Sequence, residues 1–158
     1  MIIRKLYETE TAHRVLNADS IRCSQGPHGH SYRWEIEIAG PVNPETGMLI
    51  DFGSLKPIKE MIDKFDHAYI FWDKEDPEII DFFKKHFKRL IIMRKNVTAE
   101  NMALWAHRQI NVWLQKQFNL NYTPARPVKV RVWETRTGSA IADYSTEEDE
   151  LVYLHSEE

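Results

Sequence analysis

The sequence predicts an α+β protein with an antiparallel sheet and helices packed on one of its faces. Alternating apolar and polar residues, the pattern of half-buried strands, occur near both ends of the chain. Apolar residues at helical spacing fill the region between them. Strands and helices are therefore segregated along the chain, which is typical of α+β proteins. The length of 158 residues suits one compact domain, residues 1–158.

The predicted strands follow a period of two. In residues 31–39, four large apolar side chains alternate with three charged ones, so one face of this strand is buried. By the same criterion, we expect strands at residues 2–11 and 128–134, and residues 139–144 and 150–155 fit further strands. An open antiparallel sheet has edges, and an edge strand is often covered by oligomerisation.

Three helices are predicted between the strands. Residues 54–65 have apolar side chains at helical spacing, with Ser54 as the N-cap. Residues 76–87 fit either a shorter helix or an insertion. Thr98 begins the third helix, whose apolar stripe runs as far as Phe118.

Composition excludes several classes of protein. The 21 basic and 24 acidic residues give a formal net charge of −3, whereas nucleic-acid-binding proteins typically have an excess of basic residues. No apolar run approaches the length that spans a membrane. The N-terminus becomes charged at Arg4 and Lys5, unlike a secretory signal peptide. The single cysteine, Cys23, cannot form an intrachain disulfide and suits a reducing compartment, so we expect a cytoplasmic protein.

The strongest chemical signal is a pair of histidines separated by one glycine. His28 and His30 lie at the start of the strand predicted at residues 31–39, and residues two apart on a strand point to the same side. Both imidazoles can then reach one metal ion. His13, at the end of the first predicted strand, is the natural third ligand if the two strands pair. Three histidines with one open position form a catalytic zinc site rather than a structural one.

Simpler interpretations of these residues stay open. His28 and His30 fit an exposed turn, and His13 fits a strand-end histidine that is hydrogen-bonded to backbone. Cys23 fits a small buried apolar residue. It lies, however, in a polar loop, and a cysteine beside a metal ion loses its proton readily.

Two further sites carry acidic residues. Asp66 is followed by His67, and a carboxylate beside an imidazole can tune it as a proton carrier near neutral pH. Because adjacent residues in an extended segment point apart, a turn cap and an exposed histidine are the simpler interpretation. Glu134 ends an apolar strand, where a carboxylate can bind a two-donor edge such as an amidine. A solvated surface glutamate is the more common fate of such a residue.

Six motifs, in order and over most of the chain, resemble the 6-pyruvoyl-tetrahydropterin synthase family, which includes the 6-carboxy-tetrahydropterin synthases. The motifs are Thr11-Ala12-His13-Arg14, Cys23 with His28-Gly29-His30, Gly47-Met48-Leu49-Ile50-Asp51-Phe52 with Leu55-Lys56, Asp66-His67, Asn96-Val97-Thr98-Ala99-Glu100-Asn101, and Val132-Trp133-Glu134-Thr135. The resemblance implies the T-fold, in which an antiparallel sheet carries helices on one face and strands of three subunits form a barrel. It therefore implies a homotrimer or homohexamer with active sites between subunits.

The resemblance also implies a zinc-dependent lyase that acts on 7,8-dihydroneopterin triphosphate in queuosine and preQ0 biosynthesis. The products would be 6-carboxy-tetrahydropterin, acetaldehyde and triphosphate, and zinc would act as a Lewis acid on the side-chain hydroxyls of the substrate. By this resemblance the metal ligands are His13, His28 and His30. The catalytic groups are Cys23 as general base, with Asp66 and His67 as a proton relay. The aminopyrimidine edge of the pterin is bound by Glu134, with Thr98 and Glu100 as further candidates.

Three departures from the family pattern bear on the product. Four residues separate Cys23 from His28, whereas carboxy-type members usually have three and pyruvoyl-type members five. Val97 stands where proline is usual, and the Leu-Asn that often follows the Asp-His pair is absent. Two alternatives therefore stay open: a 6-pyruvoyl-tetrahydropterin synthase acting on the same substrate, and a T-fold protein that binds a pterin or purine without turnover. Intact Cys23, Asp66 and His67 argue against the last.

Overall fold

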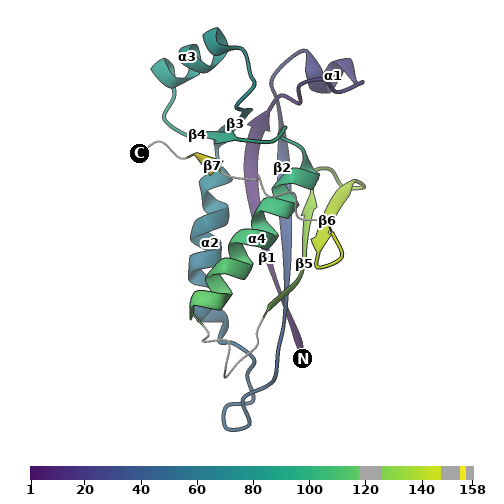
Figure 1. The fold of residues 1–158 in the computed structure, drawn as a ribbon, viewed down its shortest axis with the longest axis vertical. Helices are drawn as coiled ribbons and strands as arrows, with labels where there is room; N and C mark the ends of the chain where they lie inside the picture. Colours follow the sequence, from purple (N-terminus) through teal and green to yellow (C-terminus); the bar gives the residue numbers. More distant parts are fainter. Residues whose placement is uncertain (118–125, 147–153, 156–158) are drawn as a thin grey trace.

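The computed structural model describes residues 1–117, 126–146 and 154–155. Its strands are β1 (Ile2–His13), β2 (His28–Ala39), β3 (Ala68–Trp72), β4 (Leu90–Met93), β5 (Arg126–Trp133), β6 (Ser139–Asp143) and β7 (Leu154–His155). Its helices are α1 (Ile21–Ser24), α2 (Lys56–Ile62), α3 (Pro77–His86) and α4 (Ala99–Gln117), with the 3-10 turns η1 (Phe52–Leu55) and η2 (Asp63–Phe65) on either side of α2. Figure 1 shows an elongated sheet with α1 and α3 at one end of the molecule.

The described strands form one sheet in the order β6-β5-β2-β1-β3-β4-β7. β1 and β2 are antiparallel from Ile2 opposite Ala39 to His13 opposite His28. β3 is parallel to β1, however, and β4 is parallel to β3. The sheet is therefore mixed, and the prediction of a purely antiparallel sheet is wrong in this respect. After β2, α2 runs back along the sheet, so the chain enters β3 in the same direction as β1 (Figure 1). The segment between β3 and β4 contains α3 and is long enough for the crossover that a parallel pair requires.

The sequence does not predict β3 and β4, because neither strand alternates. β3 reads Ala-Tyr-Ile-Phe-Trp, and its first four residues are all buried. A short apolar run that is covered on both faces has no period of two by which to recognise it. The strands predicted at residues 2–11, 31–39, 128–134 and 139–144 correspond to β1, β2, β5 and β6. Of the strand predicted at residues 150–155, β7 covers Leu154–His155 and residues 150–153 lie outside the described part.

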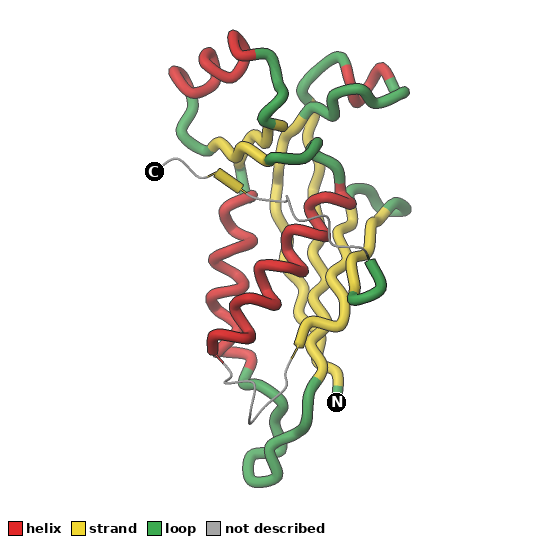
Figure 2. The backbone as a smooth tube through the Cα atoms, viewed as in Figure 1, coloured by secondary structure: helices red, strands yellow, loops and turns green. Residues whose placement is uncertain are grey.

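The hydrophobic core lies between the sheet and the helices α2 and α4, which cover the same face (Figure 2). The four apolar side chains that alternate along β2 are at most 1% exposed. At the centre of this layer the ring of Phe65 lies 5.0 Å from the Trp34 ring and 4.9 Å from the Trp105 ring, measured between centroids. These contacts confirm the predicted α+β arrangement with the helices on one face.

The opposite face of β1 and β2 combines exposed apolar residues with a partly buried ion-pair network. Ile2 and Leu6 are 55% and 51% exposed. Beside them the buried carboxylate of Glu37 accepts hydrogen bonds from Nη2 and Nε of Arg4 at 2.6 and 3.1 Å and lies 2.9 Å from the Lys129 ammonium. Exposed apolar side chains next to satisfied charges mark this face as one that can contact another molecule.

α2 is shorter than the helix predicted at residues 54–65. Ser54 lies inside η1 and is not a helix N-cap. The carboxylate of Asp51 caps η1 instead, because its Oδ1 accepts the backbone N–H of Gly53 at 2.7 Å. The predicted helix is therefore divided into η1, α2 and η2.

The other two predicted helices are confirmed. α3 follows Asp76, whose Oδ1 accepts the N–H of Glu78 at 2.8 Å. α4 follows Thr98, whose Oγ1 accepts the N–H of Asn101 at 3.4 Å, and Phe118 lies outside the described residues. In the described part of the chain, no helix combines the length and the apolar character that crossing a bilayer requires.

Candidate metal centre and active site

Three histidines converge where β1 ends and β2 begins. In the antiparallel register His13 lies opposite His28, and Thr11 lies opposite His30. His28 and His30 are two apart on β2, so their side chains share the side on which His13 lies. One ring nitrogen of each histidine lies within 4.8 Å of those of the other two. The ring centroids are 4.5, 5.2 and 5.0 Å apart. The predicted ligand set is thus assembled by strand pairing.

Backbone carbonyls orient two of the rings. Nδ1 of His13 lies 2.8 Å from the carbonyl oxygen of Val97, and Nδ1 of His28 lies 3.3 Å from that of Gly26. With Nδ1–H donating to these carbonyls, Nε2 of each ring keeps its lone pair for a metal ion. Burial lowers the pKa of His13 to about 4, so this imidazole is neutral at pH 7 as metal binding requires. Burial also lowers the pKa of His30, although the Glu134 carboxylate acts in the opposite direction.

The loop that carries the Val97 carbonyl is held by two asparagines of the motif at residues 96–101, for which the sequence predicted no role. Nδ2 of Asn101 donates to the carbonyl of Asn96 at 2.8 Å, and Nδ2 of Asn96 donates to the carbonyl of Leu16 at 2.6 Å. The N–H of Val97 donates to Oδ1 of Asn96 at 3.0 Å, a bond that proline at this position lacks. The motif at residues 96–101 therefore also helps to orient His13, through the carbonyl of Val97.

Glu134 lies beside the histidines. Its Oε1 is 3.6 Å from Nε2 of His13 and 3.8 Å from Nε2 of His30. The Tyr32 hydroxyl donates to the same oxygen at 3.0 Å and lies 3.3 Å from Nε2 of His13. Tyr32 is fully buried and enters the sequence analysis only as an apolar strand residue, so its role beside the histidines was missed.

The raised pKa of Tyr32 indicates that Glu100 and Cys23, two more of the predicted site residues, lie near its hydroxyl. Burial raises the pKa of its hydroxyl, and negative charge at Glu134, Glu100 and Cys23 raises that pKa further. Tyr32 is therefore a neutral hydrogen-bond donor, with these three side chains near enough to act on it. The half-buried Cys23 belongs to α1, and its carbonyl accepts the N–H of Val15 at 2.9 Å, which ties the cysteine loop to the end of β1.

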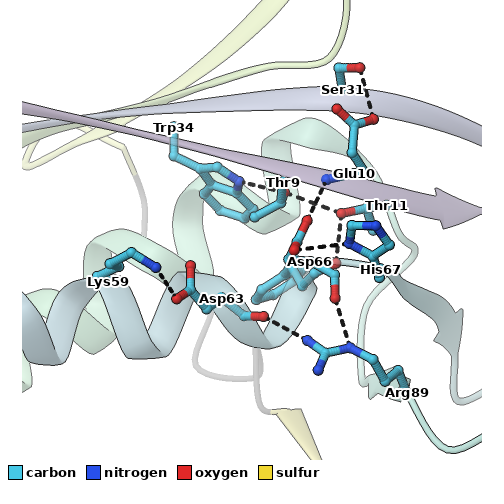
Figure 3. Close-up of polar contacts among 11 residues, drawn as sticks. Thr9, Glu10, Thr11, Ser31, Trp34, Lys59, Asp63, Asp66, His67 and Arg89 are labelled. Carbon is cyan, nitrogen blue, oxygen red and sulfur yellow. Dashed lines mark hydrogen bonds and ion pairs between the residues drawn. The ribbon is translucent and has the colours of Figure 1, made fainter.

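Asp66 and His67 form a separate pair on the other side of β1. Oδ1 of Asp66 accepts the N–H of Glu10 at 2.9 Å (Figure 3), and the backbone N–H of His67 donates to the Glu10 carbonyl at 2.6 Å. Nδ1 of His67 lies 2.9 Å from Oδ2 of Asp66, so the two side chains face one another. The expectation that they point apart is wrong, because His67 has a φ of 55° and the segment is not extended.

Hydrogen bonds hold this turn in place. Nε of Arg89 donates to the carbonyl of Asp66 at 2.8 Å, and Nη2 donates to the carbonyl of Asp63 at 2.9 Å (Figure 3). The Glu10 N–H lowers the pKa of Asp66, and the bond from His67 lowers it further, so this carboxylate is charged at neutral pH. The His67 side chain is 73% exposed. Among the described residues, no recorded contact joins this pair to the three histidines.

A cavity of about 660 Å³ lies where the ends of β1, β2 and β3 meet the segment after α3. Its lining includes His30 from the metal centre and His67 from the acidic pair. Its remaining walls are aromatic and charged: Glu10, Tyr69, Phe83, Phe87, Lys88 and Arg89, with Thr11, Ala12, Gly29, Ser31 and Ala68. The cavity therefore adjoins both sets of predicted site residues.

A mixed sheet with helices on one face and three histidines at the end of paired central strands defines a T-fold protein with a candidate metal centre. A sequence model of the family described as 6-pyruvoyl tetrahydropterin synthase matches residues 2–146. The chain therefore belongs to the 6-pyruvoyl tetrahydropterin synthase family.

Relatives of known name agree with this assignment. The chain is 38% identical over 142 residues to a 6-carboxy-5,6,7,8-tetrahydropterin synthase of Helicobacter pylori, which covers 89% of this chain and 71% of the relative. It is 32% identical over 160 residues to a putative enzyme of the same name from Pyrococcus horikoshii, covering 93% of this chain and 94% of the relative. The pterin-synthase motifs thus lie within a similarity that spans most of the chain.

Solved structures share the fold. An uncharacterized protein from Wolinella succinogenes superposes with a TM-score of 0.65 at 18% identity, covering 91% of this chain and 99% of that one. The 6-pyruvoyl tetrahydropterin synthase of Caenorhabditis elegans superposes with a TM-score of 0.61 at 23% identity, covering 90% of this chain and 94% of that one. At these identities the superpositions confirm the fold alone.

Proposed function

We propose that this chain is a zinc-dependent 6-carboxy-tetrahydropterin synthase. It would convert 7,8-dihydroneopterin triphosphate to 6-carboxy-tetrahydropterin, acetaldehyde and triphosphate, a step of queuosine and preQ0 biosynthesis. The observation that carries the proposal is the convergence of His13, His28 and His30 with Glu134 in a chain most of which resembles enzymes of that name.

The three histidines fit zinc. Each offers a ring nitrogen toward a common point, two are oriented through Nδ1, and the burial of His13 favours its neutral form. When bound, zinc supplies a Lewis acid that lowers the pKa of hydroxyl groups on the substrate side chain. The role of the protein is to leave one coordination position open for those hydroxyls.

The residues around Tyr32 would bind the pterin and move the first proton. Glu134 presents a carboxylate that can accept two N–H bonds from the aminopyrimidine edge, while Tyr32 donates to one of its oxygens and fixes its direction. Thr98 and Glu100 at the start of α4 are further candidates for this edge. Cys23 would act as the general base that takes a proton from the substrate side chain.

Asp66 and His67 would carry a proton on the opposite side of the substrate. Asp66 is charged and directed at the His67 imidazole, which keeps that ring oriented as a proton carrier. Because no recorded contact joins the pair to the histidines of its own chain, we propose that it serves a substrate held by the histidines of a second copy. The open face with Ile2 and Leu6 supports assembly into a trimer or hexamer.

Mixing two inactive variants tests the shared site. Cys23→Ser and His67→Ala are each expected to be nearly inactive alone. If sites lie between copies, dissociating and reassociating a mixture generates some sites with both groups intact, and activity returns. Activity that stays at the level of the separate variants, in a mixture whose hybrid assembly is verified by native mass spectrometry, would assign both residues to one chain.

Product analysis tests the reaction itself. The purified protein is incubated with zinc and 7,8-dihydroneopterin triphosphate, and the products are identified by mass spectrometry. 6-Carboxy-tetrahydropterin together with acetaldehyde supports the proposal. 6-Pyruvoyl-tetrahydropterin without acetaldehyde supports the second candidate, which stays open because the four-residue spacer between Cys23 and His28 is midway between the usual carboxy-type and pyruvoyl-type lengths. An unchanged substrate would overturn both enzymatic functions.

A further inference from the structure

The proposed reaction leaves one strongly charged segment without a role. Within the six positions 84–89, at the end of α3 and in the loop to β4, the chain reads Lys-Lys-His-Phe-Lys-Arg. The whole chain has a net charge of −3, so this concentration of cations is a local feature. A basic cluster on an acidic protein indicates a site for an anion.

The cluster is joined to the cavity beside His67. Lys88, Arg89 and His67 all line it, and Phe83 and Phe87 form part of its wall. Arg89 is held rigidly, because Nε and Nη2 donate to two backbone carbonyls at 2.8 and 2.9 Å. A guanidinium has five N–H groups, so further donors stay available at a fixed position.

The acidic groups in and beside this cavity, Glu10 and Asp66, already accept hydrogen bonds from the protein. Oε2 of Glu10 accepts the hydroxyl of Ser31 at 2.8 Å. Asp66 accepts the N–H of Glu10 and faces the His67 imidazole. Other basic residues near the sequence motifs are engaged as well. Nε and Nη2 of Arg14 both contact the buried carboxylate of Glu75, and Nζ of Lys56 lies 3.5 Å from Oε1 of Glu60.

We propose that Lys88 and Arg89 form a polyphosphate subsite that binds the triphosphate of the substrate. The inference rests on the proposed function for the identity of the substrate, but the anion site itself follows from the cavity. The metal centre and Glu134 account for the hydroxyls and the pterin ring, which leaves the triphosphate without partners. His67 would act on the side chain between ring and triphosphate, so cations adjoining His67 lie on the correct side. Lysine and arginine are the residues suited to phosphate oxygens.

The test substitutes Lys88 rather than Arg89, because replacing Arg89 would also remove the two hydrogen bonds that hold the turn at residues 63–67. Lys88→Ala and Lys88→Glu are compared with Lys116→Ala, an exposed lysine in the last turn of α4. Binding of inorganic tripolyphosphate is measured by calorimetry on the full zinc-loaded protein. KM and kcat are measured with 7,8-dihydroneopterin triphosphate.

We expect Lys88→Ala to weaken tripolyphosphate binding and raise KM by about tenfold, Lys88→Glu to do so more strongly, and kcat to change much less. Lys116→Ala should match the wild type. Unchanged tripolyphosphate binding and KM in both Lys88 variants would overturn the subsite. If the wild type binds tripolyphosphate through Lys88 but forms no pterin product, the anion site stands and the proposed function fails. If turnover is normal and indifferent to Lys88, the function stands and the subsite fails.

Discussion

The three histidines and the Asp66–His67 pair flank β1 but are held in place by different means. The histidines project from two long paired strands, in which His13 lies directly opposite His28. The pair occupies the turn between η2 and β3, where His67 adopts a φ of 55°. One group is positioned by a sheet and the other by a turn.

The difference has consequences for how each group tolerates change. The register of a strand is specified by its whole hydrophobic pattern, so no single distant substitution moves the side chains on it. A turn depends on a few local hydrogen bonds and on one unusual dihedral angle. We therefore expect the metal centre to respond mainly to changes of its ligands and their direct supports, and the turn to respond to its backbone.

The largest effect is expected from removing a ligand. His28→Ala should lose zinc and, because a catalytic metal contributes several kcal/mol, activity should fall on the order of a thousandfold or more. His86→Ala, a histidine of α3 that contacts Phe82, is the matched control and should keep its metal. Metal analysis of the purified proteins measures the effect. A native protein that contains no zinc and does not bind added zinc would contradict the central proposal.

Cys23→Ser separates the general base from the metal centre. The serine keeps the size of the side chain but ionises far less readily, so the rate should fall roughly a hundred- to ten-thousandfold with zinc content unchanged. Turnover near the wild-type rate would show that Cys23 is not the base. Loss of zinc from this variant would make the cysteine a fourth ligand and close the position that the substrate needs.

Glu134→Ala should weaken substrate binding rather than remove the metal. A charge-assisted pair of hydrogen bonds to the pterin is lost, which corresponds to about 2–4 kcal/mol of binding free energy. The affinity for a pterin without the triphosphate, measured by calorimetry, isolates this contact from the polyphosphate subsite. Near-normal pterin affinity would remove Glu134 from the pterin site.

Asn101→Ala tests whether the support of His13 matters. The variant loses the bond to the Asn96 carbonyl that helps to hold the loop of Val97, whose own carbonyl orients His13. Removing a group that helps to orient a metal ligand usually lowers metal affinity by about 10–100-fold. Asn111→Ala, at a partly buried asparagine further along α4, is the matched control. Equal zinc affinities in the two variants would limit the role of Asn101 to the helix start.

The sequence predicts the cluster of three histidines well because periodicity determines strands, and strands determine which side chains share a face. His28 and His30 needed only their spacing, and His13 needed only the pairing of β1 with β2. The support from Val97 was not predicted, since nothing in a sequence shows which backbone carbonyl a distant ring will meet. Tyr32 was missed for a related reason, because in an alternating strand a tyrosine and a phenylalanine carry the same apolar signal.

The turn and the second half of the sheet were harder to predict. β3 and β4 are short apolar runs whose sequences do not alternate, and their parallel pairing depends on the direction in which α2 and α3 return the chain. A positive φ at a histidine is uncommon and has no sequence signature, so the contact between Asp66 and His67 was predicted with the wrong geometry.

The smallest effect concerns that dihedral angle. At a φ of 55° a β-branched residue is disfavoured by about 1–2 kcal/mol, whereas asparagine adopts the left-handed region readily. His67→Val should therefore unfold at lower urea concentration than His67→Asn. Both variants lose the proton carrier and the ion pair of an exposed side chain, so the difference between them isolates the backbone. Their activities should be equally low while their stabilities differ. Equal unfolding midpoints would mean that the turn adopts another conformation in solution, and Asp66 would then lack the fixed partner on which the proposed proton relay depends.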